Sequence, residues 1–356
     1  MFKEKIRAIR KEMKRQNGDV LVLANAGHQI EDDLLYYLFL IPFEYACLVL
    51  PQTGPITLYG ISFEVNQLAQ AFPECRVKPF RMPWKDLAAP HVQKGQRIGI
   101  RPDVLPLSIA QSLRAIPGAR VERFRNEAQI MGIKSAEELR RMREAARITD
   151  EIFSALVRRW KRFKTEQDAG RFILTACAER GVEASFPPII ASGMHAAHPH
   201  HQTAPLPIKK GFCVIDMGVR FEGYCSDMTR TLFVGNPTKK EKELYAFFQE
   251  IQENTIREVR PGASIASLDA FCRDALGKEY SRLFIHSLGH GLGTQVHEWP
   301  SVNGNAKESL EPGMVITIEP GIYKENAFGM RIEDDVAVTK AGPDVLTKTT
   351  KDLVCI

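Results

Sequence analysis

Five side chains that could bind divalent cations lie between residues 210 and 335. Each stands in or beside an apolar segment with the composition of a strand or a turn. They are Asp216, Asp227, His290, Glu319 and Glu333. A buried carboxylate without a partner costs several kcal/mol, and a cation is a suitable partner. Four carboxylates and one imidazole could hold two divalent ions about 3.5–4 Å apart, so the sequence predicts a dinuclear metal centre.

The first two carboxylates are predicted to face each other across a hairpin. Residues 212–217 have the pattern of an apolar strand, 218–223 that of a turn with its own glycines, and 224–232 that of the returning strand. Opposed residues of an antiparallel pair bring their side chains close together. We therefore expect Asp216 and Asp227 to lie side by side.

Histidines gather on both sides of this hairpin in the sequence. His290 stands between glycines in HSLGHGLG, where the backbone can approach a ligand closely, and His297 follows seven residues later. Upstream, four histidines lie in a proline-rich segment that cannot form a regular helix: His195, His198, His200 and His201. Any one of them could be solvent-exposed. As a group they precede the first carboxylate strand closely enough for a turn to place one beside the metals as an acid, a base or an oxyanion donor.

Length and composition limit what surrounds this centre. A chain of 356 residues exceeds the size of one growing core, so we expect two domains, 1–125 and 126–356. A formal charge of +5 without a long basic run argues against nucleic acid as a partner. Seven cysteines without a CxxC pair indicate a reducing compartment. The amphipathic, charged start and the lack of a long apolar stretch predict a cytoplasmic protein without membrane contact.

The first domain is predicted to be a small α/β domain, because short strands alternate with helices along it. The expected strands are 19–24, 45–50, 56–59, 75–80, 97–100 and 120–124, and the expected helices are 64–72, 84–93 and 109–116. Its two histidines, His28 and His91, stand alone. We therefore expect no chemistry from this domain itself.

The second domain should open with a long helix. Ser135 is the expected N-cap, and Glu138 three residues later completes a capping box. A second helix over 166–180 should end at Gly181, and further helices are expected over 239–260 and 267–277.

Four segments carry a family resemblance: VIDMGVRFEGYCSDMTRTL, HSLGHGLGTQVHEWP, EPGMVITIEPGIY and GMRIEDDVAVT. They resemble the pita-bread metallopeptidases, namely methionine aminopeptidase, Xaa-Pro aminopeptidase and Xaa-Pro dipeptidase (prolidase). The resemblance covers about residues 130–350, and the ordered ligand set Asp, Asp, His, Glu, Glu is complete. The upstream domain is similar to that of prolidases and creatinases, which argues against methionine aminopeptidase; creatinase shares the fold but lacks the metal ligands. The resemblance implies an α/β (α+β) fold, with a creatinase-like N-terminal domain followed by a pita-bread catalytic domain.

The resemblance also implies how the metals are held. Asp227 and His290 would help to bind one ion and Asp216 the other, with Asp227, Glu319 and Glu333 bridging or sharing them. Two divalent ions per subunit are implied, from among Mn, Co, Zn and Fe.

Catalytic and substrate contacts are implied in the same way. His200 matches the family histidine that contacts the substrate amide, and His297 matches the one that stabilises the tetrahedral intermediate. Glu319 would carry the proton from water to the leaving nitrogen. Some prolidases bind the dipeptide carboxylate through an arginine just after the HExP stretch, where this chain has Ser301. Arg331 or a loop histidine is then the candidate for that contact.

The expected activity is hydrolysis of the bond before proline in Xaa-Pro dipeptides or short peptides, by a homodimer. One alternative is an Xaa-Pro aminopeptidase that acts on longer peptides. Two further alternatives use the same fold: a hydrolase of a small non-peptide amide, and a binding protein without catalysis. A binding protein would usually show a broken ligand set, and here the set is complete.

Overall fold

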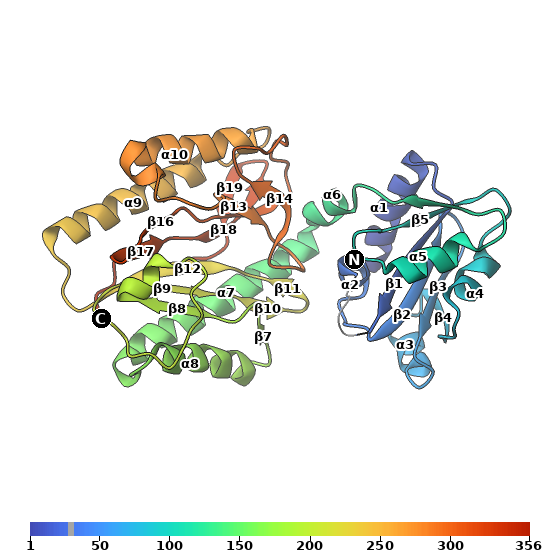
Figure 1. Ribbon diagram of the computed structural model, residues 1–356, viewed down its shortest axis with the longest axis horizontal. Helices are drawn as coiled ribbons and strands as arrows, with labels where there is room; N and C mark the ends of the chain where they lie inside the picture. Colours follow the sequence, from blue (N-terminus) through green and yellow to red (C-terminus); the bar gives the residue numbers. More distant parts are fainter. Residues whose placement is uncertain (28–31) are drawn as a thin grey trace. The chain divides into compact units, whose positions relative to one another are not determined.

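The computed structural model describes residues 1–27 and 32–356. It divides into two compact units, Met1–Met131 and Gly132–Ile356 (Figure 1). Over the described residues, no helix is both long and apolar enough to cross a membrane.

A six-stranded mixed sheet forms the centre of the N-terminal unit, in the order β4-β3-β2-β1-β5-β6. The strands are β1 (Val20–Ala26), β2 (Tyr45–Pro51), β3 (Ile56–Gly60), β4 (Cys75–Pro79), β5 (Arg97–Ile100) and β6 (Arg120–Arg123). Side chains alternate between the two faces of a strand. Along β1, Leu21 and Leu23 enter one apolar core, while Val20 and Val22 enter the other.

Helices cover both faces of this sheet. They are α1 (Phe2–Arg15), α2 (Asp33–Phe39), α3 (Val65–Ala71), α4 (Trp84–Ala88) and α5 (Leu107–Arg114), and the short α6 (Glu127–Gly132) follows β6. Residues of α1, α2 and α3 pack in one core and residues of α4 and α5 in the other. The predicted alternation of strands and helices is thus confirmed. The helix α2 was not predicted from the sequence. The carboxylate of Asp32 caps this helix by accepting hydrogen bonds from the backbone N–H groups of Leu34 and Leu35.

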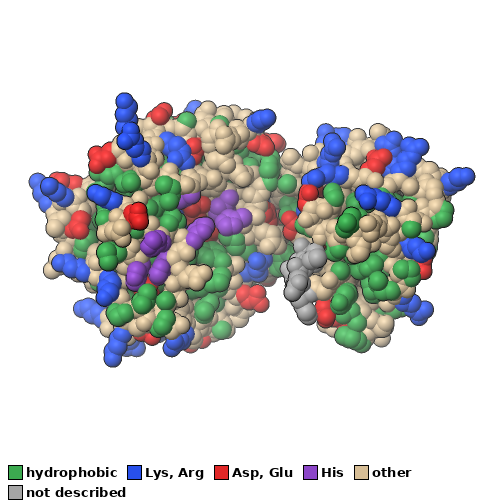
Figure 2. Space-filling model, in the orientation of Figure 1, with side chains coloured by type: hydrophobic (Ala, Val, Ile, Leu, Met, Phe, Trp, Pro, Cys, Tyr) green, Lys and Arg blue, Asp and Glu red, His purple; other side chains and the backbone are tan. Residues whose placement is uncertain are grey.

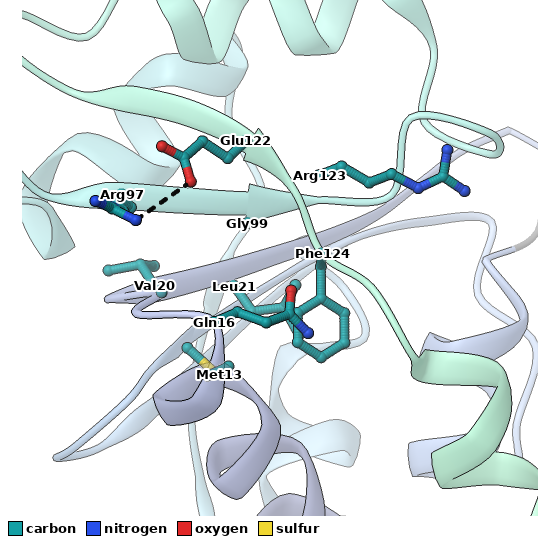
Figure 3. A pocket seen from close by; sticks show the side chains of 10 residues that line it. Met13, Gln16, Val20, Leu21, Arg97, Gly99, Glu122, Arg123 and Phe124 are labelled. Atoms are coloured by element: carbon teal, nitrogen blue, oxygen red, sulfur yellow. Dashed lines mark ion pairs between the residues drawn. The ribbon is translucent and has the colours of Figure 1, made fainter.

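The N-terminal unit contains a small cavity of about 40 Å³ (Figure 3). Arg97 and Glu122 form an ion pair at its wall, with Arg97 Nη1 3.7 Å from Glu122 Oε2. Of the two histidines, His91 lies 3.0 Å from the hydroxyl of Tyr59 through Nε2, and His28 lies outside the described residues. The groups of described residues that could hold a metal ion are both in the other unit.

The C-terminal unit consists of helices that pack on short sheets. Its long helices are α7 (Ala136–Arg159), α8 (Glu166–Glu179), α9 (Lys239–Arg257) and α10 (Ile265–Ser281). One sheet has the order β12-β9-β8, with β8 (Ile189–Ser192), β9 (Gly211–Met217) and β12 (Met228–Val234). A larger sheet has the order β14-β13-β15-β18-β19, with β13 (Gly289–Gly291), β14 (Glu298–Val302), β15 (Val315–Ile318), β18 (Asp334–Thr339) and β19 (Gly342–Val345). The hairpin of β16 (Gly321–Lys324) and β17 (Phe328–Arg331) completes this part.

These strands lie between two pairs of helices. Apolar residues of α7 and α8 pack with β9 and β12, and those of α9 and α10 pack with β15 and β18. Figure 1 shows α9 and α10 on one side of the strands and α7 and α8 on the other. The strands that carry or adjoin the predicted metal-binding residues are therefore held in place by packed helices.

Local signals at α7 are confirmed. The hydroxyl of Ser135 accepts from the backbone N–H of Glu138, and the Glu138 carboxylate accepts from the backbone N–H of Ser135 over 2.8 Å. The predicted single hairpin over 212–232 is wrong in detail. A small hairpin of β10 (Val219–Phe221) and β11 (Tyr224–Cys225) is inserted, and β10 pairs with β7 (Glu183–Ala184). As a result β12 begins only after Asp227.

Candidate metal centre

The five predicted metal-binding residues come from the ends and middles of neighbouring strands. Asp216 stands in β9 and Asp227 directly precedes β12. His290 is the central residue of β13, Glu319 directly follows β15, and Glu333 lies between β17 and β18. Ligand atoms of Asp227, His290 and Glu333 all lie within 4.8 Å of one another. The structure therefore brings together residues that are more than 100 positions apart in the sequence.

His290 is held with one ring nitrogen free to face the carboxylates. Its Nδ1 lies 3.1 Å from the carbonyl oxygen of Gly291, so Nδ1 carries the proton and donates. The remaining nitrogen, Nε2, lies 3.3 Å from Oε1 of Glu319 and 3.7 Å from Oδ2 of Asp227. A backbone carbonyl on one ring nitrogen is the usual device that orients a histidine toward a metal.

Threonine hydroxyls orient two of the carboxylates. Thr317 Oγ1 accepts from the backbone N–H of His290 and donates to Oε1 of Glu319, each over 3.1 Å. Thr229 stands opposite Asp216 in the β9–β12 ladder and donates to Oε2 of Glu333 over 2.6 Å. Neither threonine was predicted, because a threonine in a strand gives no sequence signal for such a role.

Two carboxylate oxygens in the cluster have no partner. Oδ1 of Asp216 and Oδ1 of Asp227 are buried and accept no hydrogen bond from any described residue. Asp227 is instead held through its backbone N–H, which donates to Oδ2 of Asp335 over 3.0 Å. A buried carboxylate oxygen without a donor needs a cation or a water. These two oxygens fit the metal ions that the residue types predict.

Electrostatics agree with this fit. Burial raises the pKa of Asp227 well above its ordinary range, and repulsion from Glu333 and Asp216 adds to the effect. Burial also raises the pKa of Glu333 well above its ordinary value, with repulsion from Glu319 and Asp216. Burial opposes ionisation of Glu319 too, but its hydrogen bond with His290 and the attraction of His290, Arg331 and His286 together outweigh this and lower its pKa. Carboxylates this close cannot all be charged without cations between them.

Of the two histidines predicted to contact substrate, His297 lies beside His290. The rings of His290 and His297 meet edge to face, with centroids 4.2 Å apart. Burial lowers the pKa of His297, and the neighbouring His290 and His200 lower it further. His200 is exposed. Figure 2 shows histidine side chains gathered on one face of the C-terminal unit.

Arg331, the expected partner of the substrate carboxylate, is buried and hydrogen-bonded within the protein. Its side chain is only 4% exposed, and Nη2 donates to Oδ2 of Asp216 over 2.6 Å. Nε donates to the hydroxyl of Thr229, and Nη1 donates to the hydroxyl of Tyr323 over 2.9 Å. These contacts favour a supporting role for Arg331 at a candidate metal ligand over contact with a substrate carboxylate.

The remaining loop histidines lie apart from the carboxylate cluster. His195 and His201 both contact Glu166, and His198 is exposed. The sequence singled out these histidines as a group, but it gave no signal that Glu166 joins two of them.

Comparisons with known proteins agree with both units. Residues 140–340 match the metallopeptidase family M24, and residues 5–131 match the creatinase/prolidase N-terminal domain. An uncharacterised peptidase of Staphylococcus aureus (strain MW2) is 38% identical over 252 residues, which cover 69% of this chain and 72% of that protein. These matches confirm the predicted two-part fold.

Two solved structures match over the whole length. An Xaa-Pro dipeptidase from Bacillus anthracis is 27% identical with a TM-score of 0.90, and 100% of each chain is covered. An X-Pro aminopeptidase from Thermotoga maritima is 25% identical with a TM-score of 0.86, covering 97% of this chain and 100% of that one. The fold is shared by a dipeptidase and an aminopeptidase, so it does not by itself choose between them.

Proposed function

The chain belongs to the metallopeptidase family M24 and is a peptidase, and on this basis we propose that it hydrolyses the bond before proline in Xaa-Pro dipeptides or short peptides. We further propose that it uses two divalent ions per subunit. M24 metallopeptidases depend on metal, and the solved relatives named above are an Xaa-Pro dipeptidase and an X-Pro aminopeptidase. Proline specificity rests on these relatives.

The proposal of metal dependence rests on one observation. The buried Oδ1 atoms of Asp216 and Asp227 accept no hydrogen bond from any described residue. They belong to a set of four carboxylates and one imidazole, which is the composition expected for hard divalent cations. Mn, Co, Zn and Fe are all compatible with this set. Bound ions would activate a water and polarise the scissile carbonyl.

Glu319, His297 and His200 perform the remaining steps in this proposal. Thr317 donates to Oε1 of Glu319, which leaves Oε2 to take a proton and pass it to the leaving nitrogen. His297, beside His290, donates an N–H to the negative charge that develops on the carbonyl oxygen. His200, an exposed residue, contacts the amide of the substrate.

The choice between dipeptides and longer peptides rests on the substrate carboxylate. A buried carboxylate needs a cationic partner, and Arg331 is already engaged with Asp216. This engagement favours the second candidate, an Xaa-Pro aminopeptidase. The resemblance to prolidases favours the dipeptidase, with a loop histidine such as His200 as the partner of the carboxylate. We place the dipeptidase first.

The test is turnover of Ala-Pro, Ala-Pro-Ala and Ala-Ala by protein reconstituted separately with Mn²⁺, Co²⁺, Zn²⁺ and Fe²⁺. Hydrolysis of Ala-Pro with little hydrolysis of Ala-Ala supports proline specificity. A kcat/KM about tenfold higher for Ala-Pro-Ala than for Ala-Pro, equal to about 1.4 kcal/mol of transition-state binding, would make the protein an aminopeptidase. Equal turnover of Ala-Ala would contradict proline specificity.

The homodimer and the cytoplasmic location stay predictions from the sequence. Sedimentation of the purified protein tests the first, and fractionation of the source cells tests the second.

A further inference from the structure

A second group of charged and polar side chains lies at the start of α8, outside the carboxylate cluster. Glu166 is the first residue of α8 and its side chain is 0% exposed. Oε1 lies 2.9 Å from Nδ1 of His195, and Oε2 lies 2.8 Å from Nε2 of His201. Ser192 also donates to Oε1 from its backbone N–H and from its hydroxyl, each over 2.8 Å. One buried carboxylate thus holds two imidazoles of the histidine-rich segment.

The hydrogen bonds fix the tautomer of each imidazole. An ionised carboxylate only accepts hydrogen bonds, so His195 must carry its proton on Nδ1 and His201 on Nε2. Burial opposes ionisation of Glu166, but its hydrogen bonds with His195, Ser192 and His201 outweigh this and lower its pKa. Each ring therefore donates to a separate oxygen.

The same three residues have the composition of a metal site, but their geometry does not favour one. The rings of His195 and His201 are stacked, with centroids 4.9 Å apart and planes 12° from parallel. The lone pair of a ring nitrogen lies in the plane of its ring. Two nearly parallel rings side by side do not direct their lone pairs to a common ion, whereas each can donate to its own carboxylate oxygen. The arrangement is that of a hydrogen-bonded clamp.

The hydrogen bonds of His195 and His201 with Glu166 anchor the two ends of the loop that carries His200. The backbone N–H of His198 donates to the carbonyl of His195 over 3.0 Å, and that of His201 donates to the carbonyl of His198 over 3.1 Å. The chain therefore makes two consecutive turns between its two anchors on Glu166. His200 directly precedes the second anchor.

The far side of the loop is held from β17. Nη1 of Arg331 donates to the carbonyl of Pro199 over 3.3 Å, next to His200. A side chain at Gly329 would collide with the carbonyl oxygen of Ala196, so the loop packs directly on the backbone of β17. The loop is thus fixed at both anchors and along its length.

We propose that Glu166, His195 and His201 form a positioning clamp that fixes the loop 195–201 and so holds His200 in position to contact the substrate. This inference rests on the substrate contact assigned to His200 in the proposed function. The three clamp residues do not touch substrate themselves. They act through His200.

The test compares variants that remove a clamp donor with variants that restore it. His201→Leu and His195→Leu each remove one donor, whereas His201→Gln and His195→Asn replace it with an amide N–H at a similar reach. His198→Leu is the matched control, since His198 is an exposed histidine of the same loop. Glu166 itself is left unchanged, because its loss would leave buried donors unpaired and could unfold the chain.

We expect His201→Leu and His195→Leu to lower kcat/KM for the Xaa-Pro substrate by about tenfold, with unchanged metal content. The amide variants should recover to within about threefold of the wild type, and His198→Leu should stay within about twofold. In a His200→Ala background, His201→Leu should cause no further loss, because the clamp acts through His200. Long-range ¹H–¹⁵N spectra should show His195 protonated on Nδ1 and His201 on Nε2.

Failure of this inference can be told apart from failure of the proposed function. Full turnover by His200→Ala would contradict the role of His200 in the proposed function, whatever the clamp variants do. Reduced turnover by His200→Ala with full turnover by His201→Leu and His195→Leu would overturn the clamp. Additive losses in the double variant, or the opposite tautomers, would also overturn it.

Discussion

Nη2 of Arg331 donates to Oδ2 of Asp216 over 2.6 Å, and both side chains are largely buried. The same guanidinium donates from Nε to Thr229, which in turn donates to Glu333. One buried cation thus orients two candidate metal ligands from outside the cluster. This is a positioning role that differs from recognition of a substrate carboxylate, and the two roles predict different kinetics.

Replacing Arg331 by lysine should lower activity without changing substrate preference. A lysine ammonium cannot keep the planar fork that reaches Asp216, Thr229 and Tyr323 together. We expect kcat/KM for Ala-Pro and Ala-Pro-Ala to fall together by about tenfold or more. Arg282→Lys, at an exposed arginine, is the control. A loss confined to Ala-Pro would show that Arg331 meets the substrate carboxylate.

Metal-free protein should show a pH-dependent instability that originates at Asp227. Burial raises the pKa of Asp227, with repulsion from Glu333 and Asp216, so the folded chain binds this proton more tightly than the unfolded chain. The contribution of Asp227 to stability is fully present below about pH 4, the ordinary pKa of an aspartate, and is lost as the pH rises through its raised pKa. Asp227→Asn cannot ionise and avoids this loss.

Urea unfolding in EDTA at about pH 5 and about pH 8 measures this effect. Relative to wild type, the free energy of unfolding of Asp227→Asn should be larger at the higher pH, because the variant avoids the loss of stability that ionisation of Asp227 causes. Glu325→Gln, at an exposed carboxylate, should follow the wild-type profile. If the free energy of unfolding changed equally between the two pH values in Asp227→Asn and in wild type, ionisation of Asp227 would not destabilise the metal-free protein.

His297→Ala should separate catalysis from metal binding. Burial lowers the pKa of His297, so at neutral pH the ring is uncharged and has one N–H to donate. Loss of a single donor to developing negative charge costs about 2.7–4 kcal/mol, or about 10²–10³ in kcat. Metal content, measured by elemental analysis, should stay at the wild-type value. An unchanged kcat would remove His297 from the mechanism.

The loop that carries His297 should depend on a buried ion pair. Nζ of Lys134 lies 3.0 Å from Oε2 of Glu298, with side chains 1% and 4% exposed. Lys134→Met leaves the carboxylate buried without its cation, so we expect a loss of about 3–5 kcal/mol in the free energy of unfolding. The double variant Lys134→Met/Glu298→Gln should lose less than the single one. A loss in the double variant equal to the sum of the losses of Lys134→Met and Glu298→Gln, each measured alone, would show that the two residues are not coupled.

Short sequence patterns predicted several of the helices and strands of the fold. The Ser135–Glu138 capping box is formed as predicted, since both partners lie within one turn of α7. The alternation of strands and helices in the N-terminal unit follows from patterns that each span fewer than about ten residues. The carboxylates and His290 can also be recognised from the local sequence, because each is a polar residue in an apolar strand or a glycine-rich turn.

Long-range pairings account for what the sequence did not predict. Arg331 and Asp216 are 115 residues apart, and Glu166 meets His195 and His201 across 29 and 35 residues. No local pattern indicates which distant cation or carboxylate a side chain will meet. The inserted β10–β11 hairpin was missed for the same reason, because β10 also pairs with β7, far upstream.

The central claim, a pair of metal ions held by the carboxylate cluster, is tested most directly by elemental analysis of reconstituted wild type and Asp227→Asn, with Ala-Pro turnover measured on the same samples. We expect two equivalents per subunit in the wild type. We also expect loss of bound metal and of nearly all turnover in Asp227→Asn, because the variant lacks a negative charge that neutralises the cations. Two full equivalents with normal turnover in Asp227→Asn would contradict it.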